Sequence, residues 1–383
     1  MRIAFATNPA LGHLLPLVPL AQAARDAGHE VVVVGGASLA TPVRDAGLVH
    51  VDAGPPDLPS VFARIPERSG LTGRRLAAVI WKQAFAGILA EAMATALLDL
   101  AGSWRPDLVV HEDSEQGSWV AADALGVPYI ALQATAWRGT RFRLSEEPLN
   151  RLRTVHGLPE DPGLARWHRF GFLTTRPPAL HDPADPMPAG TRPIRPSAPD
   201  PAGGEPPRWP SPNGGRPRVI VTMGTILAGR ESAMTTILDG LEQLDLDIVA
   251  MVGHDLDPAL LGPRGAATRV VRFMPLTGLL ESASLLVFHG GSGTMLAALA
   301  AGVPMVMLPV AADQPENAER CVAAGAAIAL ASDARGADEV RTAAAAVLAD
   351  QAFAAAAGSL RDEIALMPPP TDLVPFLGSL GRP

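Results

Sequence analysis

The sequence predicts an α/β protein made of two similar halves, each an open parallel β-sheet with helices on both faces. Three observations predict this fold. Short apolar runs alternate with helical patterns through both halves, and polar or glycine residues follow most of the runs. A stretch at 181–217, which holds 12 of the chain's 38 prolines, separates the halves. At 383 residues the chain also exceeds one ordinary domain, so we expect two domains facing a central crevice.

The first half alternates between expected strands and expected helices. Short runs rich in valine, isoleucine and leucine predict strands at Arg2–Thr7, Glu30–Val34, Gly47–Val51, Asp107–His111 and Val127–Leu132. Helical patterns cover Leu14–Ala27, Leu71–Ala101 and Ser114–Leu125. Ligands of such sheets bind beyond the carboxyl ends of the strands, so polar residues directly after each strand are the first functional candidates.

The second half repeats this alternation after the proline-rich stretch. Strands are expected at Arg218–Met223, Asp247–Val252, Thr268–Arg272, Leu285–Phe288 and Val303–Pro309. Helices are expected at Glu231–Leu244, Leu276–Ala283, from Ser292 onward, and at Ala337–Ala349, Ala352–Met367 and Asp372–Leu380. We therefore predict a first domain at 1–180, a linker at 181–217, a second domain at 218–370 and a last segment at 371–383.

Composition excludes several classes of function. A net charge of -8 without basic runs argues against a nucleic-acid partner. The single cysteine, Cys321, allows neither an internal disulfide nor a cysteine-rich metal site. The chain enters a strand almost at once, which leaves no room for a signal peptide, and we expect no membrane span. A cytoplasmic location is therefore predicted.

The candidate catalytic residues lie in the first half. His13 follows the first strand, and an imidazole there could act as a general base. Such a base needs a carboxylate to fix its tautomer, and Glu112 and Asp113 both follow the strand 107–111. The sequence leaves the choice between them open. The few aromatic residues gather in this half, which predicts an apolar acceptor pocket near His13 formed by Trp81, Phe85, Trp137 and Phe142.

The stretch 285–314 predicts an anion site in the second half. An apolar strand stops at His289, passes through a glycine turn and continues as a helix from Ser292. Glycines let the backbone approach a ligand, and the N–H groups at the start of a helix favour a phosphate. Further candidates end other strands or close this stretch: Gly224, Thr225, Phe273, Met274, Gly291, Gly293, Thr294, Asp313 and Gln314.

These residues also permit a second interpretation. Asp313 lies twenty residues beyond Gly293, the spacing at which a dinucleotide site keeps its ribose-binding acid, so a nicotinamide oxidoreductase stays an alternative. The motif Gly291-Ser-Gly293-Thr-Met-Leu lacks the third glycine of that fingerprint and lies in the second domain. Both points favour a different nucleotide ligand.

Several motifs resemble one known family. HGGSGT followed by AGVPMVMLP and DQPENAE resembles the sugar-nucleotide signature of family 1 glycosyltransferases of GT-B fold. The segment AFATNPALGHLLPLVPLA is similar to their N-terminal loop, and VTMGTI and PDLVV are similar to bacterial enzymes that glycosylate polyketide, macrolide and enediyne natural products. The likeness extends over nearly the whole chain.

The resemblance implies an inverting hexosyltransferase that uses neither a metal nor a resident cofactor. A dTDP- or UDP-sugar would be the donor, and a hydroxyl of a hydrophobic small molecule the acceptor. His13 would be the base and Glu112 its partner. The diphosphate would contact Thr225, His289, Gly291, Ser292, Gly293 and Thr294, the nucleobase Phe273 and Met274, and the sugar Asp313 and Gln314. A catalytically silent relative that binds nucleotide sugar or supports a partner transferase is the alternative.

Overall fold

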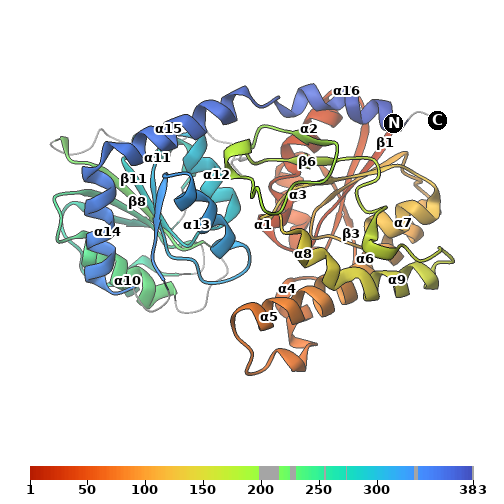
Figure 1. Ribbon diagram of the computed structural model, residues 1–383, viewed down its shortest axis with the longest axis horizontal. Coiled ribbons are helices and arrows are strands. Elements are labelled where there is room, and N and C mark those ends of the chain that lie inside the picture. The colour runs from red at the N-terminus through yellow and green to blue at the C-terminus, as the bar shows by residue number, and fades with distance from the viewer. Residues whose placement is uncertain (198–214, 225–229, 254–255, 273, 332–334, 382–383) are drawn as a thin grey trace. The chain divides into compact units, whose positions relative to one another are not determined.

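The computed structural model describes residues 1–197, 215–224, 230–253, 256–272, 274–331 and 335–381. These residues form two compact units (Figure 1). Unit 1 comprises Met1–Arg176, His181–Pro201 and Met367–Pro383, and unit 2 comprises Pro177–Leu180 and Ala202–Leu366. Each unit contains one parallel sheet with helices on both faces, so the predicted pair of Rossmann-like domains is confirmed.

Unit 1 is built on a seven-stranded sheet of order β3-β2-β1-β4-β5-β6-β7. All neighbouring strands run parallel. The strands are β1 (Arg2–Ala6), β2 (Glu30–Gly35), β3 (Val49–Asp52), β4 (Leu108–Glu112), β5 (Tyr129–Leu132), β6 (Phe172–Thr174) and β7 (Thr191–Pro193). The sequence did not predict β6, and β7 lies inside the stretch predicted as linker. Both are three residues long, too short for a clear apolar pattern.

Side chains of β1 alternate between two cores, as the pleat of a strand requires. Ile3 and Phe5 face the core under α2, α3 and α16, whereas Ala4 and Ala6 face the core under α6, α7 and α9. Figure 1 shows these helices on the two faces of the sheet. The helices of unit 1 are α1 (Leu11–Leu14), α2 (Val18–Asp26), α3 (Ala40–Asp45), α4 (Leu58–Ala63), α5 (Gly73–Ile80), α6 (Ala90–Ala101), α7 (Ser118–Leu125), α8 (Gly139–Phe142), α9 (Glu146–Val155) and α16 (Pro370–Leu380).

One expected helix begins later in the structure, and a short helix precedes it. The sequence predicts a single helix at 14–27, but α1 ends at Leu14 and α2 begins at Val18. Pro16 and Pro19 explain the break, because a proline has no N–H for the preceding turn and is tolerated only near a helix start. His13 lies in the short helix α1, which follows β1 and was not predicted.

A long helix runs from Gly73 to Ala101, as predicted, but its middle, Trp81–Leu89, is a π-helix. Among the described residues this helix has the length and apolar composition of a membrane span, with a mean hydropathy of 1.6, and the helices Ala337–Ala349 and Gln351–Leu366 would do so only if they are taken together across a bend of 73°. The helix from Gly73 to Ala101 contacts α7 and α9 within unit 1. The absence of a membrane span remains a prediction.

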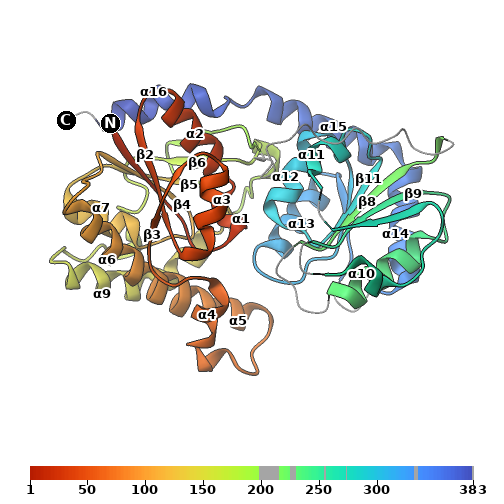
Figure 2. The same ribbon diagram turned by 180° about the vertical axis from the view of Figure 1, so that it is seen from behind.

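Unit 2 is built on a six-stranded parallel sheet of order β10-β9-β8-β11-β12-β13. Helices α10 and α14 cover one face, and α12 contacts α15 and α11 (Figure 2). The strands are β8 (Arg218–Thr222), β9 (Asp247–Met251), β10 (Thr268–Val271), β11 (Leu285–Phe288), β12 (Met305–Met307) and β13 (Ala327–Ala329). The helices are α10 (Arg230–Leu241), α11 (Leu276–Leu280), α12 (Ser292–Ala300), α13 (Gln314–Ala323), α14 (Ala337–Ala349) and α15 (Gln351–Leu366).

Candidate functional site

The strand order places the first candidate site at a reversal point of the unit 1 sheet. Strands β1 and β4 are neighbours although two strands separate them in sequence, and Ala6 pairs with His111. Their following segments therefore leave the sheet side by side and in opposite directions, which opens the crevice where ligands of such sheets bind. His13 follows β1, and Glu112 ends β4.

A hydrogen bond joins these two residues. The Nδ1 atom of His13 lies 3.0 Å from Oε1 of Glu112. The Glu112 side chain is fully buried, whereas 16% of the His13 side chain is exposed. Burial alone would raise the pKa of Glu112, but the His13 imidazole and hydrogen bonds from Ser114 outweigh it and lower this pKa below its usual value. The structure thus pairs His13 with a buried, ionised Glu112.

The neighbouring carboxyl, Asp113, is directed to another segment. It accepts hydrogen bonds from the backbone N–H of Ala134 at 3.0 Å and from the hydroxyl of Thr135 at 3.0 Å. Successive residues at the end of a strand point to opposite faces, which explains why Glu112 and Asp113 diverge. Asp113 therefore holds the loop after β5, and Glu112 is the carboxyl that contacts the imidazole.

Two further polar residues at this site were missed by the sequence analysis. Asn8 donates from Nδ2 to Oε1 of Glu112 at 2.8 Å, and the backbone N–H of Ser114 donates to Oε2 at 2.7 Å. Both residues are buried. Both residues could have been found from the sequence, because each closely follows a strand, as His13 and Glu112 do in the prediction.

The four predicted acceptor residues lie in one aromatic cluster that includes His13. Phe85 stacks on the His13 ring at 6.0 Å between centroids, and Trp81 lies 5.6 Å from Phe85. Phe142 lies 5.5 Å from Trp81 and 5.0 Å from Trp137. Trp81 is buried, whereas the other three predicted residues are half-buried. Trp167, which the sequence analysis did not single out, extends the cluster at 4.3 Å from Phe142.

Two buried carboxyls near this site give a pH prediction. Burial raises the pKa of Asp113 and of Glu115 to about 7. Above pH 4 the unfolded chain ionises these groups while the folded chain keeps them protonated. Stability is therefore lost as pH rises towards 7, by at most about 1.4 kcal/mol per pH unit for each carboxyl. Glu112 has the opposite effect on stability, because its pKa is lowered: the stability that it contributes is lost as pH falls below about 4.5.

Denaturant unfolding at a series of pH values from 5 to 7.5 measures this slope. We expect the free energy of unfolding of the wild type to fall over that range, and the fall to be smaller in Asp113→Asn. Parallel pH profiles of wild type and variant would contradict the assignment of part of this slope to Asp113.

The second candidate site occupies the equivalent reversal point of the unit 2 sheet. Strands β8 and β11 are neighbours, and Thr222 pairs with Phe288. Gly224 follows β8, and His289 follows β11. Burial lowers the pKa of His289, so that its imidazole is neutral near pH 7. Helix α12 begins at Ser292 with Gly291 as its N-cap, and its first N–H groups provide the predicted anion-binding feature.

The His289 ring lies between two glycines that leave it almost no free space. A Cβ atom on Gly291 would lie 2.7 Å from Nε2 of His289, and one on Gly224 would lie 2.7 Å from Cε1. Gly224 also has a positive φ of 67°, which side chains other than glycine rarely adopt. Both glycines are thus required by the position of one imidazole ring.

Alanine substitutions in this turn should have contrasting effects. Gly291→Ala should displace His289 and lower the free energy of unfolding by about 1–3 kcal/mol. Gly293→Ala is the matched control, because nothing lies within 4 Å of an added Cβ there. Chemical denaturation measures the stability of both variants, and calorimetric titration with dTDP measures their affinity. We expect Gly291→Ala to lose stability and affinity, whereas Gly293→Ala keeps its stability; equal stabilities would contradict the prediction.

Asp313 and Gln314 lie at the start of α13, where their side chains support the turn. Asp313 accepts a hydrogen bond from the Ser292 hydroxyl at 2.5 Å, and Oε1 of Gln314 accepts from the N–H of Val310 at 2.8 Å. The fully buried Asn317, missed by the sequence analysis, donates to the Gly290 carbonyl at 2.8 Å and to Asp313 at 3.2 Å. A shared network therefore fixes the glycine turn against α13.

The remaining predicted donor residues are placed as follows. Thr294 is half-buried in the first turn of α12, and Met274 is half-buried just before α11. Thr225 and Phe273 lie outside the described residues. Among the described residues, no group of three or more His, Cys, Asp or Glu side chains is arranged to hold a metal ion.

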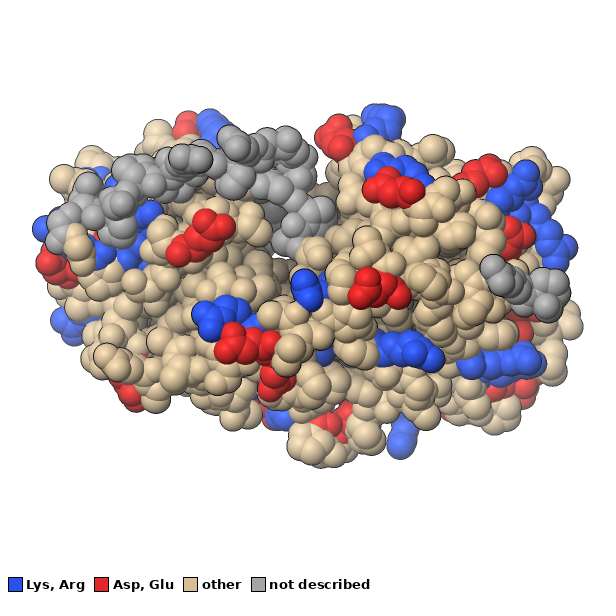
Figure 3. Space-filling model, turned by 90° about the horizontal axis from the view of Figure 1, so that it is seen from above, with Lys and Arg blue, Asp and Glu red and all other residues tan. Residues whose placement is uncertain are grey.

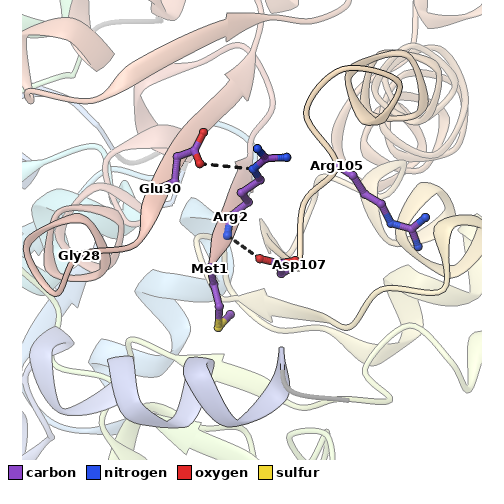
Figure 4. A pocket seen from close by; sticks show the side chains of 6 residues that line it. All are labelled: Met1, Arg2, Gly28, Glu30, Arg105 and Asp107. Atoms are coloured by element: carbon purple, nitrogen blue, oxygen red, sulfur yellow. Dashed lines mark hydrogen bonds and ion pairs between the residues drawn. The ribbon is translucent and has the colours of Figure 1, made fainter.

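Charged side chains also line one pocket outside the two candidate sites. On the face shown in Figure 3, acidic and basic groups are interspersed among uncharged ones. A shallow pocket at the amino ends of β1 and β2, opposite the end that carries His13, is lined by charged groups (Figure 4). These groups bind one another: Arg2 contacts Glu30 at 3.3 Å, and its backbone N–H donates to Asp107 at 2.7 Å.

Comparisons with known proteins cover nearly the whole chain. Models of the erythromycin biosynthesis protein CIII-like N-terminal and C-terminal domains match residues 22–147 and 235–380. The chain is 33% identical to the elloramycin glycosyltransferase ElmGT of Streptomyces olivaceus, covering 97% of this chain and 96% of that protein. It is 31% identical to the L-demethylnoviosyl transferase of Streptomyces niveus, with 97% and 96% covered.

Solved structures agree with these relatives. The glycosyltransferase SnogD from Streptomyces nogalater matches with a TM-score of 0.81 and 32% identity, covering 100% of both chains. The spinosyn rhamnosyltransferase SpnG complexed with thymidine diphosphate matches with a TM-score of 0.80 and 26% identity, covering 99% of this chain and 100% of that one. The same SpnG protein has also been solved with the spinosyn aglycone.

Proposed function

The chain belongs to the erythromycin biosynthesis protein CIII-like family of GT-B glycosyltransferases, and from this premise we propose an inverting transfer from a dTDP- or UDP-sugar to a natural-product hydroxyl. The enzyme class follows from the relatives, which are sugar transferases. The observation that carries the proposed mechanism is the contact between His13 and the buried Glu112 at a sheet reversal point.

His13 is the proposed general base. With Nδ1 donating to Glu112, the lone pair of the imidazole is on Nε2, which would take the proton of the acceptor hydroxyl. The acceptor oxygen would then form a bond to the anomeric carbon as the bond from that carbon to the diphosphate breaks. The nucleoside diphosphate would leave with the electron pair of the broken bond. Glu112 would stabilise the imidazolium that forms.

The aromatic cluster beside His13 supports an apolar acceptor. Phe85 lies against the base itself, and Phe142 and Trp137 present half-buried ring surface. Aromatic side chains of this kind offer large apolar contact area to a ligand. The spinosyn aglycone bound to SpnG, a relative of 26% identity, is a small-molecule acceptor of this general type.

The glycine turn of unit 2 is the proposed donor site. The N–H groups at the start of α12 and the neutral His289 would donate hydrogen bonds to the diphosphate, which is the group that gains charge as the sugar leaves. This electrostatic contribution supports a reaction with no resident cofactor or metal. Thymidine diphosphate bound to SpnG favours a thymidine nucleotide. A cytoplasmic location completes the proposal.

A ligand panel tests the donor class. We expect dTDP or UDP to raise the melting temperature more than GDP or NADH, because a ligand that binds only the folded state adds about 2.7 kcal/mol of stability at a hundred times its Kd. Transfer to an aglycone, followed by NMR assignment of the anomeric configuration, then tests inversion. A larger shift with NADH than with dTDP would favour the oxidoreductase alternative, and retention of configuration would exclude the single-displacement mechanism.

A further inference from the structure

We propose that Asn8 and Ser114 are positioning residues that hold Glu112 with its Oε1 atom directed at His13. The inference rests on the proposed role of His13 as base and adds the groups that make its partner effective. Neither residue needs to contact a substrate, because both act through Glu112.

The two oxygens of Glu112 share the Ser114 hydroxyl, which lies 3.0 Å from Oε1 and 2.8 Å from Oε2, but otherwise have different partners. Oε2 accepts from the backbone N–H of Ser114 at 2.7 Å and from its hydroxyl at 2.8 Å. Oε1 accepts from Nδ2 of Asn8 at 2.8 Å and contacts Nδ1 of His13 at 3.0 Å. Ser114 thus holds Oε2 through its N–H and contacts both oxygens through its hydroxyl, and Asn8 shares Oε1 with the imidazole.

Asn8 also orients the Ser114 hydroxyl. Its Nδ2 atom lies 3.1 Å from Oγ of Ser114, so one amide hydrogen can reach Glu112 and the other Ser114. This matters because Oγ of Ser114 also lies 3.0 Å from Nδ1 of His13. With its hydrogen directed to Glu112, the hydroxyl does not donate to the imidazole, and Nδ1 keeps its own hydrogen.

The network fixes the chemistry of His13. Asn8, Ser114 and Glu112 are each at most 2% exposed, so water does not substitute readily for these contacts. A carboxylate that receives this many hydrogen bonds is stabilised in its ionised form, although it is buried. It therefore accepts from Nδ1–H of His13 and does not take the proton, which leaves Nε2 as the basic nitrogen.

Histidine-selective 15N labelling and NMR can read the tautomer of His13 directly, with His13→Ala used to assign its signals. We expect the Nδ1–H tautomer in the wild type and a mixture of tautomers in Asn8→Ala and in Ser114→Ala. Ser118→Ala is the matched control, because Ser118 is also a fully buried serine of this region but contacts Glu115, and no contact that the structure describes joins it to Glu112 or His13.

Kinetics on the same variants give a second readout. Loss of either positioning residue should lower kcat by about tenfold to a hundredfold, as removal of groups that orient a functional side chain commonly does. KM for donor and acceptor should stay within about twofold of the wild type. A pure folding defect would lower the active fraction without changing the tautomer, and the NMR signal separates the two cases.

The outcomes distinguish this inference from the proposed function. If the Nδ1–H tautomer persists in both Asn8→Ala and Ser114→Ala, or if Ser118→Ala changes it equally, the positioning role is wrong even when transfer depends on His13. If His13→Ala transfers sugar at the wild-type rate, the proposed base is wrong whatever the tautomer. Should Asn8→Ala fail to fold, the Ser114→Ala measurement alone decides the question.

Discussion

Replacing His13 by alanine should lower kcat by about 10²–10⁴-fold, the usual contribution of a positioned general base. The acceptor hydroxyl would then have to lose its proton to water, while the other rings of the aromatic cluster and the glycine turn stay in place. KM for the donor should change little, because His13 lies in unit 1 and the proposed diphosphate site in unit 2. Steady-state transfer to an aglycone, with release of nucleoside diphosphate as the signal, measures both parameters.

Three further variants sharpen this test. His156→Ala, at the end of α9 in the same unit, should keep wild-type activity. Glu112→Gln should lose most of the activity, because an amide can donate to Nδ1 and so favour the wrong tautomer. Asp113→Asn should keep most of it, since Asp113 binds Ala134 and Thr135. Full activity of His13→Ala would remove the mechanism, and no transfer by the wild type with any donor would favour a silent, nucleotide-sugar-binding role.

Replacing Arg218 by methionine should lower the free energy of unfolding of unit 2 by about 3–5 kcal/mol. Arg218 and Asp247 stand opposite each other at the starts of β8 and β9, and both side chains are fully buried. Arg218 donates from Nε to Asp247 at 2.7 Å and from another nitrogen to the Ser282 hydroxyl at 2.7 Å. Without Arg218, Arg269 is the one cation left in the described contacts of the buried Asp247 carboxylate, at 2.9 Å.

Arg216→Met is the matched control for this prediction. Arg216 lies two positions before Arg218 in the sequence and pairs with Asp245 at 2.5 Å. Both of these side chains are exposed, so loss of this ion pair should lower the free energy of unfolding by less than about 1 kcal/mol. Guanidinium unfolding followed by circular dichroism compares the variants. In the double variant Arg218→Met with Asp247→Leu much of the stability should return, because both fully buried charges are removed together and Arg269, which loses its contact with Asp247, is 27% exposed and can reach water. Equal stabilities of Arg218→Met and Arg216→Met would contradict the account.

The fold could be predicted from the sequence because its signals are local. Each longer strand is a run of branched apolar residues, and the helix predicted at Ala337–Ala349 has those bounds in the structure. Parallel order then brings the ends of β1 and β4 together, which is why His13 and the acids after β4 could be proposed as neighbours. The short strands β6 and β7 were missed because pairing with a neighbouring strand, and not an apolar pattern of their own, defines them.

The finer structure of the site depends on contacts between distant residues. Glu112 and Asp113 are adjacent and chemically alike, and only the pleat of β4 decides which of them reaches the imidazole. Asn8 lies 104 positions from Glu112 in sequence, so no spacing rule would connect them. The π-helix at Trp81–Leu89 likewise looks like ordinary helix in sequence, because it differs in hydrogen bonding and not in apolar pattern.

The place of α16 in the chain has a consequence for biosynthesis. Leu373 and Leu377 of this helix pack into the core of unit 1 with residues of β1 and α2, yet the ribosome makes them only after Ala202–Leu366. At 5–20 residues per second this delay lasts on the order of ten to thirty seconds. The nascent N-terminal unit therefore carries an uncovered apolar face beside α2 throughout that interval. We expect a chaperone that binds exposed apolar surface to associate with it until translation reaches α16.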